Sequence, residues 1–482
     1  MTTFLVSLVA LILGYLIYGR LVDNMFKPTD LPTPAMIHND GVDYVPLPTW
    51  RVFMIQLLNI AGLGPIFGAL AGAMWGPVVY LWIVLGSIFA GGVHDYLSGM
   101  ISLREDGASI PEVVGRHMGK TMLTFMRIFT ILILFLIGVL FISGPAMLLA
   151  KLTGLGVTPW LIAVLIYYFL ATFLPIDKII GRFYPIFSIC LLVMAGGLLV
   201  GLLTGAGGHV LPEMSLTNMF PAPAGKQLPI WPLMCVTVAC GAISGFHSTQ
   251  SPLMARCLKN ERLGRPVFYG AMISEGIIAL IWAAAGVSFY DGTAGLAAAL
   301  KSGGPGGVVY DVCVGLMGNG LGATLAMLGV VACPITSGDT AFRSARLILA
   351  DWFKIPQTDN VKRLKLAIPL ILVGALLTQV SFPVLWNYTS WSNQVLAAMV
   401  LWAGADYMYR KCENRYAFLM PMIPATFMSI VSSTYILQAK EGLQLPTTIT
   451  WPAGVVIGLL ALALFLKHTV YGPKEEVLIE NK

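Results

Sequence analysis

Runs of about 20 apolar residues recur along the whole chain, and they constrain its fold more than any other feature. They are centred near residues 11, 62, 89, 133, 166, 194, 237, 278, 328, 374, 395, 425 and 459. Hydrophobic residues make up 57% of the 482 residues and charged residues 11%, which leaves too little polar surface for a soluble protein. We therefore expect an all-α polytopic membrane protein with about thirteen transmembrane helices and no separate soluble domain.

The basic residues test this count independently. Segments that follow odd-numbered spans hold 24 of the 29 lysines and arginines. Segments that follow even-numbered spans hold only four, and Arg127 alone lies within a span; the four are Lys151, Lys226, Lys301 and Lys440. Because lysine and arginine concentrate in cytoplasmic loops, we expect the N-terminus outside and the C-terminus in the cytoplasm.

Several functional classes lack the residues they need. The net charge of +6 comes without a basic and aromatic module, so no nucleic-acid partner is expected. The seven cysteines form no C-x-x-C pair and mostly fall in apolar runs, which indicates small core residues, with no metal or cofactor. Metalloprotease, hydrolase and P-loop motifs are absent, so we expect no enzyme. A channel, or an intramembrane hydrolase using Ser244 with His247, is the alternative.

Two apolar runs contain helix-breaking residues at corresponding places. The second run holds Gly62, Gly64 and Pro65, and the seventh contains G-A-I-S-G-F-H-S-T-Q-S-P at 241–252. Proline removes a backbone donor and glycine lowers the cost of leaving helical geometry. We predict breaks near 62–65 and 244–252; the alternative is that the glycines only let helices pack closely.

Five crossings separate the two broken runs, so the runs traverse the bilayer in opposite directions. Paired interruptions in two inverted halves are typical of the binding site of a secondary transporter. We expect repeats at 51–205 and 229–405, with the first helix and 413–467 peripheral. Backbone groups freed at a break can bind a carboxylate or a cation where they line a cavity. The expected substrate site comprises Gly62, Gly64, Pro65, Ser244, Gly245, Phe246 and His247.

Ionisable residues within spans are costly in lipid and are therefore candidates for ion coupling. Glu275 lies among apolar residues of the eighth span, where it either loads and releases protons or holds a neighbouring helix. Asp95, beside His94 near the end of the third span, either takes part in proton coupling or pairs with an arginine. His247 is suited to shuttle a proton or to bind a substrate carboxylate, and a structural role is the alternative.

Eight motifs, in order along residues 39 to about 430, resemble the CstA carbon starvation family. They are N-D-G-V-D-Y-V-P (39–46), A-G-x-G-P (61–65), G-x-x-x-D (91–95), R-E-D-G-x-S (104–109), I-S-G-F-H (243–247), Y-G-A-M-x-x-E (269–275), D-T-A-F-R-S-A-R (339–346) and N-Q-x-L-A-A (393–398). The resemblance implies the amino acid, polyamine and organocation superfamily, with a leucine-transporter-like 5+5 inverted repeat. It also implies uptake of pyruvate, or alternatively of short peptides during nutrient starvation, across a bacterial inner membrane. A proton gradient is the expected driving force.

The resemblance also suggests roles for residues late in the chain. In such a fold, the first helix of repeat one and the third helix of repeat two form a cation site. Thr336 and Ser337 then lie where Na⁺ or a proton-replacing water binds, and Asp339 either joins them or pairs with Arg343. Asn393 and Gln394 are expected to hold helices together or to contribute to a gate. The chain is shorter than the long family members and carries S-T-Q-S-P at 248–252 in place of their run, so the substrate stays open.

Overall fold

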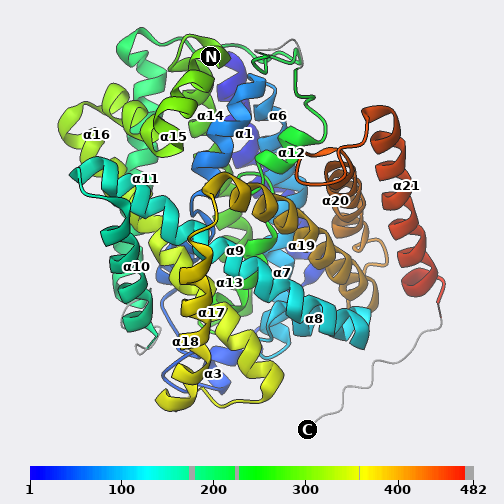
Figure 1. The fold of residues 1–482 in the computed structure, drawn as a ribbon. Coiled ribbons are helices and arrows are strands. Elements are labelled where there is room, and N and C mark those ends of the chain that lie inside the picture. The colour runs from blue at the N-terminus through cyan, green and yellow to red at the C-terminus, as the bar shows by residue number, and fades with distance from the viewer. Residues whose placement is uncertain (173–179, 223–226, 358, 473–482) are drawn as a thin grey trace.

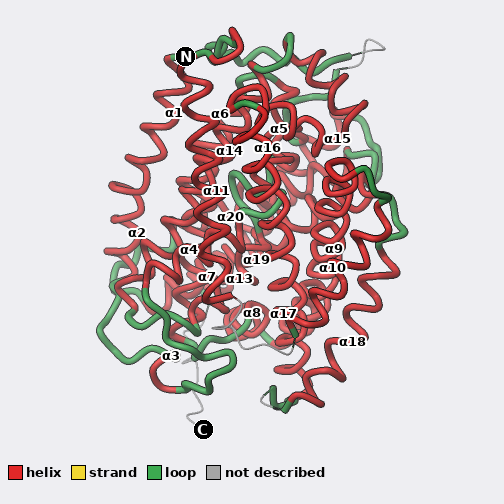
Figure 2. Tube along the Cα trace, turned by 90° about the vertical axis from the view of Figure 1, so that its left-hand side faces the viewer, coloured by secondary structure: helices red, strands yellow, loops and turns green. Residues whose placement is uncertain are grey.

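The computed structural model describes residues 1–172, 180–222, 227–357 and 359–472, and within these ranges the secondary structure is entirely helical (Figure 2). Seven helical stretches are long and apolar enough to cross a membrane, and the bent pair Thr49–Ile60 with Gly64–Trp75 adds an eighth. The all-α polytopic class is thus confirmed, while the count of about thirteen crossings stays a prediction. Four basic residues of the charge alternation lie outside the described residues: Lys178, Lys226, Lys474 and Lys482.

In chain order, the helices divide into two halves. The first half contains α1 (Thr2–Leu13), α2 (Gly19–Phe26), α3 (Pro34–Ile37), α4 (Thr49–Ile60), α5 (Ala69–Gly72), α6 (Val79–Leu85), α7 (Gly92–Arg104), α8 (Ile110–Met118), α9 (Lys120–Thr153), α10 (Val157–Ala171) and α11 (Ile180–Thr204). The second half contains α12 (Leu233–Thr237), α13 (Gly245–Ala255), α14 (Gly270–Ser288), α15 (Gly292–Met317), α16 (Asn319–Leu325), α17 (Ala332–Phe353), α18 (Asn360–Leu377), α19 (Phe382–Lys411), α20 (Leu419–Gln438) and α21 (Thr447–Phe465).

Short π and 3₁₀ turns join or extend these helices. The π turns are η1 (Gly14–Tyr18), η2 (Gly64–Gly68), η4 (Gly86–Gly91), η7 (Arg265–Tyr269), η8 (Ala326–Val331) and η9 (Leu466–Val470). The 3₁₀ turns are η3 (Ala73–Trp75), η5 (Ala206–Gly208) and η6 (Glu261–Leu263). Because a π turn adds a residue without stopping the helix, η4 and η7 lengthen α7 and α14 into membrane spans.

Burial separates central helices from peripheral ones. The span that contains α14 is 83% buried, whereas the spans of α1 and α21 are 28% and 22% buried. Figure 1 shows α20 and α21 together at one edge of the bundle, with α9, α13 and α19 near its middle. The first and last helices therefore lie outside the core that surrounds α13 and α14. The exact repeat boundaries stay a prediction.

A buried ionic cluster joins α8, α19 and η9. The imidazole of His117 contacts Asp406 through Nδ1 at 3.0 Å and Glu105 through Nε2 at 3.1 Å. Asp406 also accepts hydrogen bonds from Arg410 Nε and Thr469 Oγ1, each at 2.8 Å. Burial alone would lower the pKa of His117, but the two carboxylates outweigh it and raise that pKa above its usual value. The imidazole of His117, which is protonated more readily than a free histidine, therefore fastens the end of α19 to α8.

Candidate functional site

The helix that begins at Thr49 stops inside its apolar run. α4 ends at Ile60, η2 begins at Gly64, and the two axes differ by 52°. The N–H of Gly62 donates to Ile60 O at 2.9 Å, so the carbonyl of Leu58 loses its donor four residues later. The predicted break near 62–65 is confirmed. Sequence and geometry agree because Gly62 and Pro65 lie where the regular helical hydrogen bonds are interrupted.

The second break lies earlier than predicted. α12 ends at Thr237, residues 238–244 are not helical, and α13 begins at Gly245 and continues past Pro252. The prediction of a break over 244–252 is wrong in its extent. Hydroxyl side chains explain the difference, because Ser248 donates to Gly245 O at 2.6 Å and Thr249 donates to Phe246 O at 2.7 Å. These bonds satisfy the polar side chains within a continuous helix.

The two interrupted segments pack directly against each other. A Cβ atom added to Gly64 would lie 2.2 Å from Cys240 Sγ. A Cβ atom added to Gly68 would lie 2.9 Å from the carbonyl oxygen of Thr237. Only glycine allows the second non-helical segment to approach the first so closely. The glycines of the first break therefore serve both the break and the packing that the alternative interpretation proposed.

A cavity opens between the two breaks and the middles of α9 and α19. Its twelve lining residues are Gly64, Ile137, Leu140, Phe141, Thr237, Ala239, Cys240, Phe246, Trp386, Thr389, Ser390 and Asn393. These side chains are apolar or neutral and polar, and no charged side chain is among the twelve. The two aromatic rings of Phe141 and Phe246 meet edge to face, with centroids 5.8 Å apart. Such a lining is typical of a small-molecule site that positions its ligand with a few polar groups.

Asn393 of α19 holds the second break in place. Its Oδ1 accepts a hydrogen bond from the N–H of Phe246 at 2.6 Å, and its Nδ2 donates to Ser244 Oγ at 2.8 Å. The neighbouring Gln394 donates to Ile243 O at 3.0 Å. Both amides therefore contact the broken segment, as expected for helix contacts. The N–H of Phe246, which we expected to meet a substrate carboxylate, is already donated to Asn393.

Four buried ionisable side chains form a chain beside the cavity. His94 Nδ1 lies 2.7 Å from Asp95 Oδ1, and Asp95 Oδ2 lies 2.9 Å from His247 Nδ1. His247 Nε2 in turn lies 3.3 Å from Glu275 Oε2. The side chains come from α7, α13 and α14, and all four are fully buried. An alternation of imidazole and carboxylate groups at these distances can pass a proton from one group to the next.

Cys240 lies at the end of this chain, on the wall of the cavity. Its Sγ, His247 and Glu275 bring donor atoms within 4.8 Å of one another, a spacing that a metal ion also requires. His247 Nε2 and both carboxylate oxygens of Glu275 are buried without a hydrogen-bond partner among the described residues. The absence of a metal therefore stays a prediction. The sequence predicts Cys240 only as a small core residue, because its spacing from other residues does not indicate that it lines the cavity.

α17 contacts the carbonyls that the first break frees. Ser337 Oγ donates to Leu58 O at 3.0 Å, and Cys333 Sγ donates to Ala61 O at 2.7 Å. Thr336 Oγ1 instead donates to Cys333 O on its own helix at 2.7 Å. Of the two hydroxyls expected at a cation site, Ser337 meets the break. Sequence reasoning missed Cys333, which lies one helical turn before Ser337 and shares its face.

The side chain of Asp339 accepts a hydrogen bond from a residue that the sequence does not indicate. Tyr184 of α11 donates its hydroxyl to Asp339 Oδ2 at 2.8 Å. Arg343, the proposed partner of Asp339, forms an ion pair with Asp43 in the loop before α4. A tyrosine from α11 therefore orients Asp339 and links it to the middle of α17.

Comparison with known proteins gives transporters as named relatives. The chain is 40% identical to an uncharacterized membrane protein of Haemophilus influenzae, over 63% of this chain and 95% of that protein. It is 25% identical to the peptide transporter CstA of Bacillus subtilis, over 89% of this chain and 88% of that protein. It is 28% identical to the pyruvate/proton symporter BtsT of Escherichia coli, over 52% of this chain and 43% of that protein.

Solved structures show the same fold at low sequence identity. A manganese transporter of Eremococcus coleocola aligns with a TM-score of 0.57 and 13% identity, over 90% of this chain and 98% of that chain. Mhp1, a nucleobase-cation-symport-1 family transporter, aligns with a TM-score of 0.55 and 14% identity, over 89% of this chain and 95% of that chain. The expected leucine-transporter-like fold class is thus confirmed. The family model described as carbon starvation protein CstA matches residues 1–144 and 145–303, so this multi-pass membrane protein belongs to the CstA family.

Proposed function

We propose that the chain is a secondary active transporter that couples a proton to the uptake of pyruvate or a similar small carboxylate. The buried chain from His94 to Glu275 carries this proposal, because it ends beside a cavity that both broken helices line. Charged groups buried at membrane depth are costly and mark ion pathways. Asp95, His247 and Glu275, three separate candidates in the sequence, form one continuous contact chain.

The contacts of α17 favour a proton over Na⁺ as the coupling ion. A sodium ion binds oxygen ligands, and the carbonyls of Leu58 and Ala61 are two of the backbone oxygens freed at the first break. Ser337 and Cys333 already donate to these two carbonyls. These two oxygens therefore have donors, whereas the chain that contains Glu275 offers buried titratable groups that a proton can occupy.

The cavity favours a small carboxylate over a peptide. A peptide carries an ammonium group that needs an acceptor of negative charge, and the twelve lining residues include no carboxylate. Neutral donors such as Thr389, Ser390 and the amide of Asn393 suit a carboxylate and a keto oxygen. Uptake of short peptides is the second candidate, and the peptide transporter of Bacillus subtilis, which aligns over most of its length, favours it.

The remaining assignments follow the sequence. We place the chain in a bacterial inner membrane with its N-terminus outside and its C-terminus in the cytoplasm, since the basic residues alternate in that sense. Repeats at 51–205 and 229–405 move relative to each other, and the breaks of α4 and of the 238–244 segment lie at their interface. The chain moves its substrate intact and performs no enzymatic reaction.

Uptake of labelled pyruvate into proteoliposomes tests the proposal. An inward proton gradient should drive accumulation above equilibrium, a protonophore should abolish it, and replacing Na⁺ with choline should leave it unchanged. Unlabelled dipeptides should compete weakly. Accumulation that needs Na⁺, or that dipeptides block at lower concentrations than unlabelled pyruvate, would refute the coupling ion or the substrate class respectively.

A further inference from the structure

A carboxylate is buried at the end of the molecule where the basic loops gather. Asp43 belongs to the long loop between α2 and α4, which contains the short helix α3, and is only 3% exposed. The side chain of Asp40 accepts hydrogen bonds from the N–H groups of Val42, Asp43 and Tyr44 at 2.8, 3.0 and 2.9 Å. This turn directs Asp43 inward. The loop is also tied down by Leu47, whose N–H donates to Cys257 O at 3.0 Å.

Four arginines surround this carboxylate. Arg343 and Arg346 of α17 approach it most closely, and the charges of Arg256 and Arg363 also act on it. Burial alone would raise the pKa of Asp43, but the guanidinium groups outweigh it and hold that pKa below its usual value. All four arginines are themselves at most 5% exposed. Asp339 acts on Arg343 and Arg346, and Asp351 pairs with Arg256 at 3.9 Å. Among the described residues, the four guanidinium groups therefore still outnumber the three carboxylates of this buried cluster.

The pocket holds its own carboxylate loosely. Arg343 Nη1 and Arg346 Nη2 lie 3.4 and 4.0 Å from the same oxygen, Oδ1 of Asp43. On the surface of the same loop, Arg262 binds Asp30 through two bonds of 2.8 and 2.7 Å. A buried ion pair offsets its desolvation only when its geometry is good. A free carboxylate that reaches both guanidinium groups at about 2.8 Å would therefore bind this pocket better than Asp43 does.

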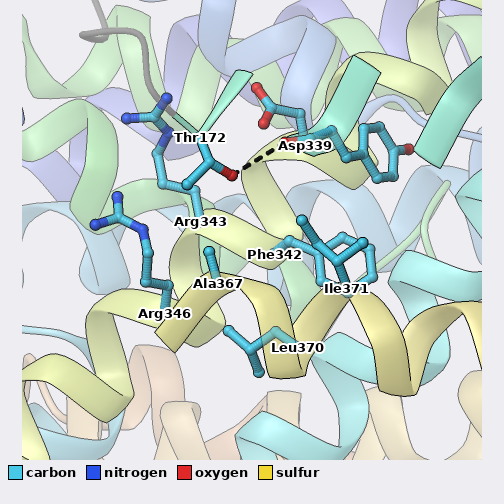
Figure 3. Close-up of a pocket in the computed structure, with 9 residues that line it drawn as sticks. Thr172, Asp339, Phe342, Arg343, Arg346, Ala367, Leu370 and Ile371 are labelled. Carbon is cyan, nitrogen blue, oxygen red and sulfur yellow. Dashed lines mark hydrogen bonds between the residues drawn. The ribbon is translucent and has the colours of Figure 1, made fainter. Parts of the chain in front are cut away.

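α17 places this pocket on a path from the first break. Ser337 contacts a freed carbonyl of α4, and Arg343 and Arg346 follow six and nine residues later on the same helix. At 1.5 Å per residue, the arginines lie about 9 and about 14 Å further along the helix axis. Figure 3 shows both guanidinium groups extending to one side of α17, beside Thr172 and away from Phe342. The charge alternation predicts that this end is cytoplasmic.

We propose that Arg343 and Arg346 form a second carboxylate site, on the route by which cargo leaves toward the cytoplasm, and that Asp43 occupies this site when no cargo is there. The identity of the cargo rests on the proposed function. Asp43 then closes the exit between transport cycles, and a leaving carboxylate displaces it. The excess of positive charge supplies the attraction that the neutral cavity near Asn393 lacks.

Titration of the purified protein with pyruvate tests this inference. Asp43→Asn removes the competing charge and keeps the shape, so the apparent Kd of pyruvate should fall on the order of tenfold if the pocket is open about a tenth of the time in the wild type. Methyl pyruvate, the uncharged ester, should show no such gain. Adding Arg343→Gln to Asp43→Asn should return the Kd to the wild-type value. Binding is followed by calorimetry, with Asp30→Asn as the matched control in the same loop.

Each outcome decides between occupancy by Asp43 and a purely structural ion pair. Equal affinity of wild type and Asp43→Asn, or a gain that survives Arg343→Gln, would overturn the inference. If Asp43→Asn fails to fold, the double variant Asp43→Asn with Arg346→Gln removes one positive charge together with the negative one. This double variant should still bind pyruvate more tightly than the wild type does, through Arg343. Equal affinity of the double variant and the wild type would overturn the inference. If the wild-type protein accumulates no pyruvate while Asp43→Asn still gains affinity for it, the proposed function fails and this inference stands.

Discussion

Asn393→Ala removes both hydrogen bonds that hold the second break to α19. The N–H of Phe246 can only donate, which fixes Oδ1 of Asn393 toward it and Nδ2 toward Ser244. Leaving the buried N–H of Phe246 without an acceptor costs about 1–3 kcal/mol, and losing the neutral bond to Ser244 costs about 0.5–1.5 kcal/mol. We therefore expect the free energy of unfolding to fall by about 1.5–4.5 kcal/mol. Uptake should fall with it, because the start of α13 is no longer positioned.

Denaturant unfolding of the purified protein measures this loss. Asn387→Ala is the matched control, since Asn387 is the same side chain on the same helix but donates to Glu441, away from the cavity. The control should lower stability while uptake per folded molecule is retained. A change below about 0.5 kcal/mol in Asn393→Ala would refute the assignment of Asn393 as the clamp of the break.

Three further variants test other parts of the site. Glu275→Gln should keep the protein folded and retain pyruvate exchange, yet abolish accumulation driven by a proton gradient; accumulation at the wild-type level would remove Glu275 from coupling. Gly64→Ala should destabilise by about 1–3 kcal/mol through overpacking against the facing thiol, whereas Gly196→Ala, where an added Cβ meets open space, should not. Because the folded pKa of His117 is raised, its contact with Asp406 stabilises below the ordinary histidine pKa of about 6.5 and is lost as pH rises through the higher folded value. His117→Gln should flatten this dependence of the unfolding midpoint on pH, and an unchanged profile would contradict it.

The sequence predicts those features of the fold that depend on local chemistry. Apolar run length indicates helices that cross a membrane, and Gly62, Gly64 and Pro65 predict the first break because they act on their own backbone. The same reliance on local chemistry predicts the second break at the wrong place. Hydroxyl and amide residues at 248–252 are poor helix formers in isolation, but their side chains bond to carbonyls of the preceding turn. The helix α13 therefore continues through Pro252.

Contacts between distant segments could not be read from spacing. The chain of His94, Asp95, His247 and Glu275 joins α7 to α13 and α14, which lie about 150 residues later in the sequence. Each carboxylate has a structural alternative when it is considered alone, and only the fold shows that they are consecutive. The sequence does not indicate that Asp43 is buried, because an acidic residue in a loop rich in proline is ordinarily exposed. Its burial depends on the arginines of α17, which lie 300 residues away.

In the proposed function, proton coupling and cargo binding meet on a single helix, α13. His247 faces Asp95 and Glu275, while the adjacent Phe246 lines the cavity and donates its N–H to Asn393. Neighbouring residues in the first turn of one helix move together, so a proton that changes the contacts of His247 also displaces Phe246 and the clamp. The two sites then share one two-state element, which is the physical requirement for a coupling free energy between them. We therefore expect substitutions at the start of α13 to uncouple proton movement from substrate uptake, even where the proton chain and the cavity each stay intact.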